Sequence, residues 1–247
     1  MDNIIIGRNP VFEAIRAGRE IDKIIVKKGE CEGSLVAIIK RAKDVKIPVI
    51  EADRAKLDAL SDGKNHQGVI AFAAAHTYTD VKDMIKSAKE KSSSPFIIIL
   101  DKITDPHNFG SILRTANCAG ADGVIIPKRG GVGLSETVAK TSAGALEYIP
   151  VAKVTNIAET MEMLKKEGFW IAGAEADGQL MYKTDLTGAI ALVIGSEGEG
   201  ISRLVKEKCD FLCRIPMYGE INSLNASVAA GVMMYEIVRQ RENGGKQ

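Results

Sequence analysis

The stretch AIALVIGSEGEGISRLVKEKCDFLCRIP, residues 189–216, has two apolar runs, AIALVIG and DFLCRIP, that are typical of short buried strands. The segment ISRLVKEK lies between them, after a glycine-rich turn. The same alternation extends upstream, where strands are indicated for 96–101, 123–127, 149–154 and 169–176. Helices are indicated between these strands for 109–120, 134–148 and 156–168. Downstream, the chain ends in a last helix from about Ser223 to Arg241. This alternation predicts an α/β unit with a mostly parallel sheet that is covered on both faces.

Residues 1–75 have the pattern of a second, smaller α/β unit. Strands are indicated for 21–28, 47–52 and 67–75, and helices for 34–46, 53–62 and a segment that starts at Asn9-Pro10. The following segment TYTDVKDMIKSAKEKSSSP, residues 77–95, can hold a short helix at VKDMIKSAK, but its four lysines and serine triplet are typical of a linker. We therefore predict domains at 1–75 and 96–247 with a linker at 76–95.

The composition is that of an ordinary globular protein. Of 247 residues, 45% are hydrophobic and 26% are charged, and the net charge of +1 lacks the strong basicity that by itself indicates nucleic acid. Basic residues outnumber acidic ones by 13 to 11 in residues 1–75, which favours an anionic partner for that unit. The start has no signal-peptide pattern, and no run of 18 apolar residues occurs.

The four cysteines, Cys31, Cys118, Cys209 and Cys213, do not have the spacing of a metal site. We expect reduced, mostly buried thiols in a cytoplasmic protein without a bound metal.

Ligands of parallel α/β sheets bind at the carboxyl ends of the strands, and three loops at such places carry glycine and small polar residues. They lie at 101–120, at 194–202 and at 215–225, the start of IPMYGEINSLNASVAAGVMMYE. The second loop carries Glu197 and Glu199, which would repel a polyphosphate, so it suits a neutral or cationic ligand. The same acids are also explained by a tight turn at a helix start, where the helix dipole favours Glu.

Each of the other two loops has a simple structural explanation when it is taken alone. Arg114 follows Ser111 by three residues on the predicted helix, and a lone helix arginine is usually a solvated surface charge. Asn222 or Ser223 is a good helix cap. The helix that follows is expected to bury Leu224, Val228 and Val232.

Taken together and in this order, the three loops resemble the motifs of the SpoU (TrmH) family of RNA ribose 2′-O-methyltransferases, within the SPOUT class. The motif residues that match are Asn108, Gly110 and Arg114 in the first loop, Gly195 and Glu197 in the second, and Ser223 and Asn225 in the third. The likeness covers about residues 97–240.

The resemblance implies a C-terminal domain with a deep trefoil knot, a homodimer, and S-adenosyl-L-methionine as methyl donor without a metal. It implies donor contacts, largely through backbone groups, at Gly195, Ile215 and Leu224. It implies catalytic roles for Arg114, Asn108, Glu197, Ser223 and Asn225. The family places a base at the first-motif arginine, but a guanidinium is effectively always charged. Arg114 is therefore better suited to hold a phosphate and the developing alkoxide.

The first unit resembles the L30e-like RNA-binding domain found in the ribosomal RNA branch of the family, through GRNPVFEAI at 7–15 and NHQGVIAF at 65–72. The resemblance thus implies methyl transfer to a ribose 2′-hydroxyl of RNA, with a guanosine of 23S ribosomal RNA as the expected target. Two alternatives stay open. One is a tRNA 2′-O-methyltransferase of the same family, and the other is a non-catalytic RNA- or ribosome-binding protein.

Overall fold

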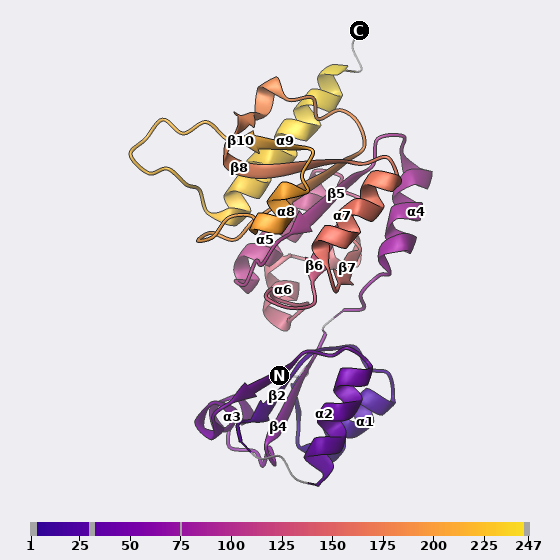
Figure 1. Ribbon diagram of the computed structural model, residues 1–247, viewed down its shortest axis with the longest axis vertical. Coiled ribbons are helices and arrows are strands. Elements are labelled where there is room, and N and C mark those ends of the chain that lie inside the picture. Colours follow the sequence, from indigo (N-terminus) through magenta and orange to yellow (C-terminus); the bar gives the residue numbers. More distant parts are fainter. Residues whose placement is uncertain (1–3, 30–32, 75, 245–247) are drawn as a thin grey trace. The chain divides into compact units, whose positions relative to one another are not determined.

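The computed structural model describes residues 4–29, 33–74 and 76–244, which divide into two units with one sheet each (Figure 1). The first unit contains the described residues up to Thr77, and the second contains most of the residues from Tyr78 onward.

The first unit has a four-stranded sheet in the order β1-β4-β2-β3. Its elements are β1 (Ile4–Ile6), α1 (Arg8–Arg16), β2 (Ile21–Lys27), α2 (Ser34–Asp44), β3 (Val49–Ala52), α3 (Arg54–Ser61) and β4 (Val69–Ala73). Strand β2 is parallel to β3 and antiparallel to β4, which in turn is antiparallel to β1. Ile24 of β2 belongs to the core formed with α1 and α2, whereas Ile25 packs with Leu57 of α3, so both faces of the sheet are covered.

The second unit has a six-stranded sheet in the order β10-β8-β9-β5-β6-β7, in which every neighbouring pair is parallel. Its strands are β5 (Phe96–Leu100), β6 (Gly123–Pro127), β7 (Val151–Val154), β8 (Trp170–Leu180), β9 (Ile190–Ile194) and β10 (Phe211–Arg214). The register of the central pair joins Phe96 to Ile190 and Leu100 to Ile194. The predicted α/β fold with a mostly parallel sheet is confirmed.

Helices cover both faces of this sheet (Figure 1). They are α4 (Val81–Lys91), α5 (Pro106–Cys118), α6 (Glu136–Thr141), α7 (Ile157–Lys166), α8 (Arg203–Glu207) and α9 (Ala226–Gly244), with short 3₁₀ helices η1 (Ala145–Glu147) and η2 (Met181–Lys183). Helices α4, α7 and α8 pack on the face that presents Ile97 and Ile99. Helices α5 and α9 pack against each other, and they adjoin β6 and β9 respectively.

The segment at 76–95 is not a simple linker, because helix α4 occupies most of it. Met84, Ile85 and Ala88 of this helix are buried, and Met84 and Ile85 join the core of the second unit. Apolar residues at this spacing lie on one face of a helix, which leaves the lysines on the exposed face. Asp80 caps the helix by accepting the backbone N–H of Lys82 at 2.8 Å.

The cap of helix α9 differs from the expected one. The side-chain oxygen of Asn225 accepts the backbone N–H groups of Ser227 at 2.9 Å and of Val228 at 3.3 Å. Asn225 is therefore the capping residue, and the expectation of Asn222 or Ser223 is wrong. All three residues are suitable caps by type, so the sequence alone did not distinguish them.

The buried face of α9 also differs from the expected one. It consists of Ala226, Ala230, Met233, Met234 and Ile237. Leu224 and Val228 are 37% and 50% exposed, and Val232 is only partly buried. The helix therefore buries small residues and methionines toward the sheet and α5, and it leaves an apolar stripe uncovered.

Three cysteines fall within the described residues, and all three are free thiols. Cys118 is exposed, contrary to the expectation that most thiols are buried, whereas Cys213 is buried. Desolvation raises the pKa of the Cys209 thiol to about 12, so this group stays protonated at neutral pH. Cys31 lies outside the described residues.

None of the helices in the described part of the chain has the length and apolar character that a membrane crossing requires. Among the same residues, no group of three or more His, Cys, Asp or Glu side chains is arranged to hold a metal ion.

Helix α5 and helix α9 each contain one interior glycine, and only one of the two is sterically required. A Cβ added at Gly110 would lie 2.5 Å from Cβ of Thr141, whereas one added at Gly231 would meet nothing closer than Thr115 at 3.6 Å. Gly110→Ala should therefore destabilise the protein by about 1–3 kcal/mol through overpacking. Gly231→Ala, the matched control, should stabilise it by up to about 1 kcal/mol. Urea unfolding of both variants measures these changes, and a stabilised Gly110→Ala would contradict the tight contact.

Candidate functional site

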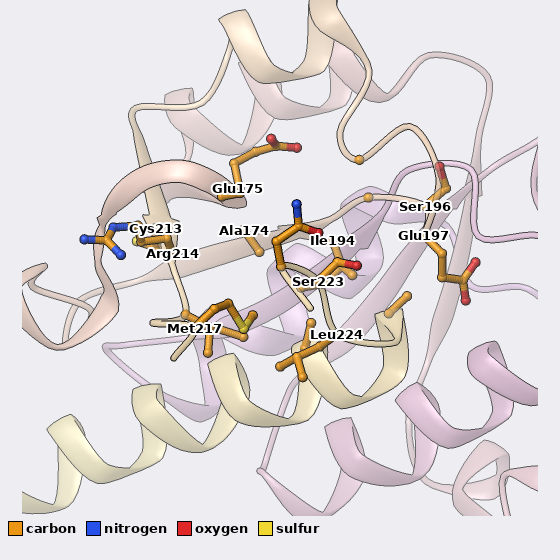
Figure 2. Close-up of a pocket in the computed structure, with 17 residues that line it drawn as sticks. Ala174, Glu175, Ile194, Ser196, Glu197, Cys213, Arg214, Met217, Ser223 and Leu224 are labelled. Atoms are coloured by element: carbon orange, nitrogen blue, oxygen red, sulfur yellow. The ribbon is translucent and has the colours of Figure 1, made fainter. Parts of the chain in front are cut away.

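A pocket of about 400 Å³ lies at the carboxyl ends of β9 and β10 and beside the middle of β8 (Figure 2). Its lining comprises Ala174, Glu175 and Ala176 from β8, Ile194, Gly195, Ser196, Glu197 and Gly200 from the end of β9 and its loop, Cys213, Arg214, Ile215 and Met217 from β10 and beyond, and Asn222, Ser223, Leu224, Ala226 and Ala229 around the start of α9. The pocket is thus at the edge of the sheet where parallel α/β folds bind ligands.

The loop after β9 has a closed conformation. The backbone N–H of Ser196 donates to the carbonyl of Gly200 at 3.1 Å, and the N–H of Gly200 donates back to Ser196 at 2.9 Å. A Cβ at Gly195 would overlap the backbone of Gly200, so glycine is required where the two ends of the loop approach. The buried carboxylate of Asp101, at the end of β5, accepts the N–H of Ser202 at 2.7 Å and holds the far end of the loop.

Three side chains from the three predicted motifs form one hydrogen-bonded chain. The amide nitrogen of Asn225 donates to the amide oxygen of Asn108 at 3.0 Å, and the amide nitrogen of Asn108 donates to the carboxylate of Glu197. Asn108 is only 7% exposed, whereas its two partners Glu197 and Asn225 are exposed, so the two bonds are partly buried. A carboxylate can only accept, which fixes the orientation of both amides: each nitrogen points toward Glu197 and each oxygen points away. The oxygen of Asn225 is then left to cap α9.

The structure gathers most of the residues that the sequence singled out. Gly195, Glu197, Ile215, Ser223 and Leu224 all line the pocket. Asn108 and Asn225 connect to it through Glu197.

Arg114 is placed differently from the other candidate residues. It is exposed on α5, its side chain has no ion pair or hydrogen bond to any residue in the described ranges, and it lies outside the described residues that line the pocket. Its guanidinium is therefore available to an external anion. Glu199 also lies outside that lining, and its carboxylate faces Lys102 at 3.5 Å.

Glu175, which lies on the pocket wall in the middle of β8, was not among the residues singled out from the sequence. One of its oxygens accepts the backbone N–H of Ile201 at 2.7 Å, and the other lies 3.2 Å from the ammonium of Lys206. The available signal was an acidic residue next to the last position of the predicted strand at 169–176. In the sheet this strand lies between β9 and β10. A local sequence pattern does not contain that long-range information.

A second pocket of about 280 Å³ lies within the first unit and is rich in cations. It is lined by Arg8, Lys27, Arg54, Asn65, His66, Gln67 and Gly68. The Nε of Arg8 donates to the carbonyl of Gln67 at 3.0 Å, which fixes the guanidinium at the N-terminus of α1. His66 is buried and bonded to Asp58 at 2.9 Å, so it supports the pocket wall. The three basic side chains make this pocket suitable for an anion.

Two family models match the chain. Residues 95–235 match the SpoU rRNA Methylase family, and residues 4–79 match a domain described as RNA 2′-O ribose methyltransferase substrate binding. A TrmH family tRNA/rRNA methyltransferase of Staphylococcus aureus (strain MSSA476) is 50% identical over 246 residues, 99% of each chain. A protein of Bacillus subtilis (strain 168) with the same family name is 48% identical over 243 residues, 98% of this chain and 97% of its own.

Solved structures show the same likeness. The SpoU methyltransferase AviRb from Streptomyces viridochromogenes superposes with a TM-score of 0.63 at 25% identity, covering 98% of this chain and 90% of its own. The TrmH/SpoU tRNA modifying enzyme of A. aeolicus superposes with a TM-score of 0.57 at 30% identity, over 66% of this chain and 85% of its own. Because the first family model spans more than half of the residues and the relatives match nearly end to end, the chain belongs to the SpoU family of tRNA/rRNA methyltransferases.

Proposed function

We propose that the protein transfers a methyl group from S-adenosyl-L-methionine to a ribose 2′-hydroxyl of RNA. The observation that carries this proposal is the hydrogen-bonded chain Asn225–Asn108–Glu197, which joins three separate motifs at the wall of one pocket. A chain of this kind is expected where side chains must be held in a fixed orientation for reaction.

The residues around the pocket fit this donor. The donor is a sulfonium cation without phosphate, and the pocket wall carries the carboxylates of Glu175 and Glu197. The remaining lining includes Gly195 and Gly200, which have only backbone to present, and apolar side chains such as Leu224, a combination that suits a purine with hydrogen-bonding edges. When bound, the donor supplies a methyl carbon activated by the sulfonium, and the electron pair of the carbon–sulfur bond stays on sulfur when the methyl group is transferred to oxygen.

The roles of the side chains follow from their positions. In-line displacement depends mainly on alignment, so we assign Glu197 and Ser223, which line the pocket, to orient the attacking 2′-hydroxyl. Asn108 and Asn225 hold Glu197 in place through their directed bonds. Arg114, exposed on α5, binds the RNA phosphate and stabilises the charge that develops as the hydroxyl proton leaves for solvent.

The RNA class proposed is ribosomal, with a guanosine of 23S ribosomal RNA as the target. The support is the first unit, which matches the substrate-binding family model and resembles the domain of the ribosomal RNA branch. The alternative is tRNA, because the related proteins carry both RNA classes in their names. Labelled donor with separate ribosomal RNA and tRNA pools, followed by mapping of the labelled nucleotide, distinguishes the two. Donor binding without transfer to either pool would instead favour a non-catalytic RNA-binding protein.

We also propose a homodimer formed through the second unit, and a trefoil knot in its C-terminal part as the family resemblance implies. An exposed apolar stripe on and before α9 supports the dimer: Leu224, Val228 and Tyr235 are 37%, 50% and 51% exposed, and Tyr218 and Ile221 of the preceding loop are 91% and 78% exposed. A monomeric mass in light scattering at micromolar concentration would contradict the dimer.

Arg114→Ala should leave donor affinity within a few-fold of the wild type, because Arg114 lies outside the described pocket lining. The single-turnover rate of methyl transfer should fall on the order of 10²–10³-fold, which is typical for loss of a group that stabilises developing charge. Arg114→Lys should recover little of the rate, because an ammonium lacks the planar fork of the guanidinium. Near-normal transfer by Arg114→Ala would remove Arg114 from the mechanism.

Asn225→Asp separates the cap of α9 from the link to Asn108. The aspartate keeps an oxygen for the cap but loses the N–H donor that Asn108 requires, so two acceptors face each other. We expect a stability within about 1 kcal/mol of the wild type, since Asp and Asn cap equally well. The transfer rate should fall at least about tenfold. Asn156→Asp, the same change at the cap of α7, is the control and should change neither quantity. Wild-type transfer by Asn225→Asp would show that the link is dispensable.

The cationic pocket of the first unit is proposed as a binding site for an RNA phosphate. Replacing both Lys27 and Arg54 with Gln should weaken RNA affinity about tenfold at low salt and reduce the slope of log affinity against log salt by about 1–2. Lys56→Gln, which removes a charge from α3 outside the described lining of this pocket, is the control. Equal salt slopes for the double variant and the wild type, measured by fluorescence anisotropy, would contradict the site.

A further inference from the structure

We propose that Glu175 is a donor-binding residue whose carboxylate accepts hydrogen bonds from the donor's ribose hydroxyls or from its ammonium group. This inference rests on the proposed function, because it takes S-adenosyl-L-methionine as the ligand of the pocket. No motif includes Glu175, and its role follows from its position and its partners.

Glu175 is placed to reach both the loop after β9 and the pocket. It lies in the middle of β8, and its side chain is only 15% exposed. Its Oε1 accepts the N–H of Ile201 at 2.7 Å, and a Cβ added at Gly200 would lie 2.7 Å from this oxygen. In Figure 2 the carboxylate points toward the loop, and Met217 and Leu224 lie at the other side of the pocket. The residue also lines the pocket.

The hydrogen-bonding capacity of this carboxylate is not used up. Its two oxygens offer about four acceptor positions. The protein fills one with Ile201 at 2.7 Å and one with Lys206 at 3.2 Å. A nearly buried carboxylate gains from further donors, because its unused lone pairs are otherwise shielded from water.

The charge on Glu175 is only partly balanced by Lys206. The ammonium of Lys206 lies closer to Asp177, at 2.9 and 3.0 Å from its two oxygens, than to Glu175. Arg214, a cation that does line the pocket, points away from Glu175 and Ser223 in Figure 2. The pocket therefore retains negative character on the β8 side, which complements a donor with a net positive charge.

A purely structural role has a different signature. Glu175 could serve only to fasten the loop through Ile201 and α8 through Lys206. The chain offers a matched control, because Asp177 shares the same lysine but lies outside the described lining of the pocket. Asp177→Asn perturbs Lys206 without touching the proposed ligand, and Glu175→Gln removes the charge while it keeps the shape and an oxygen for Ile201.

The experiment is calorimetric titration of the full-length variants with S-adenosylhomocysteine and with 5′-methylthioadenosine, which keeps the ribose but lacks the amino-acid part. We expect Glu175→Gln to weaken binding of S-adenosylhomocysteine at least about tenfold, the loss typical of a charge-assisted hydrogen bond. Asp177→Asn should stay within about twofold of the wild type. Equal weakening of 5′-methylthioadenosine assigns the contact to the ribose, and loss confined to S-adenosylhomocysteine assigns it to the ammonium.

Lys206→Met provides a second criterion that does not depend on Glu175→Gln folding well. If Glu175 binds the donor, this variant should bind S-adenosylhomocysteine as tightly as the wild type or more tightly. If Glu175 acts only through Lys206, binding should weaken. Unchanged binding by Glu175→Gln, or equal losses in Glu175→Gln and Asp177→Asn, overturns the inference. A wild-type protein that binds neither ligand would instead contradict the proposed function itself.

Discussion

The carboxylate of Glu197 accepts hydrogen bonds and cannot donate them, and this sets the direction of the bonds that join three distant segments. Asn108 must present its nitrogen to Glu197, and its oxygen is then left for the nitrogen of Asn225, 117 residues away in sequence. The oxygen of Asn225 in turn caps α9. One acidic side chain thereby determines the orientation of two amides and the place where the last helix begins. A reversed amide at either position would set two like groups against each other.

The parallel sheet supplies the frame for this chain. The strand order β10-β8-β9-β5 brings the carboxyl ends of strands from separate parts of the sequence to one edge, and the loops that leave them surround one pocket. Asp101 at the end of β5 accepts a backbone N–H of the loop after β9, and Glu175 in the middle of β8 accepts another. The required glycine at position 195 allows this loop to close on itself. The site is therefore held by rigid elements, which suits a reaction that depends on alignment.

The sequence predicted the fold class because the strands of the second unit are short apolar runs of the kind buried on both faces. It singled out Asn108, Glu197 and Asn225 through the resemblance of three ordered segments to the SpoU motifs, and the structure brings these three side chains together. It did not predict which of Asn222, Ser223 and Asn225 caps α9, since that choice depends on the tertiary bond to Asn108. Glu175 was missed for a related reason, because strand order is not encoded locally.

Exposure was also difficult to predict from apolar character alone. Leu224 and Val228 have the character of core residues, but the packing of α9 on α5 turns Ala226 and Ala230 inward instead. The segment before β5 was predicted to be a linker because of its lysines and serines. Its apolar residues nevertheless have the spacing of a helix, and the structure forms helix α4 there. Apolar periodicity thus predicted α4 better than composition did. The face that α9 buries depends instead on its contact with α5, which periodicity does not reveal.

The most direct measurement of the central claim is the alkali resistance of the methylated product. Hydroxide cleaves RNA because the 2′-oxygen attacks the adjacent phosphorus, and a methylated 2′-oxygen cannot do so. RNA labelled by this protein with S-adenosyl-L-methionine carrying a radioactive methyl group should therefore release its label in alkali-resistant dinucleotides. Label recovered in mononucleotides after alkaline hydrolysis would place the methyl group on a base and would contradict a ribose 2′-hydroxyl as the acceptor at this site.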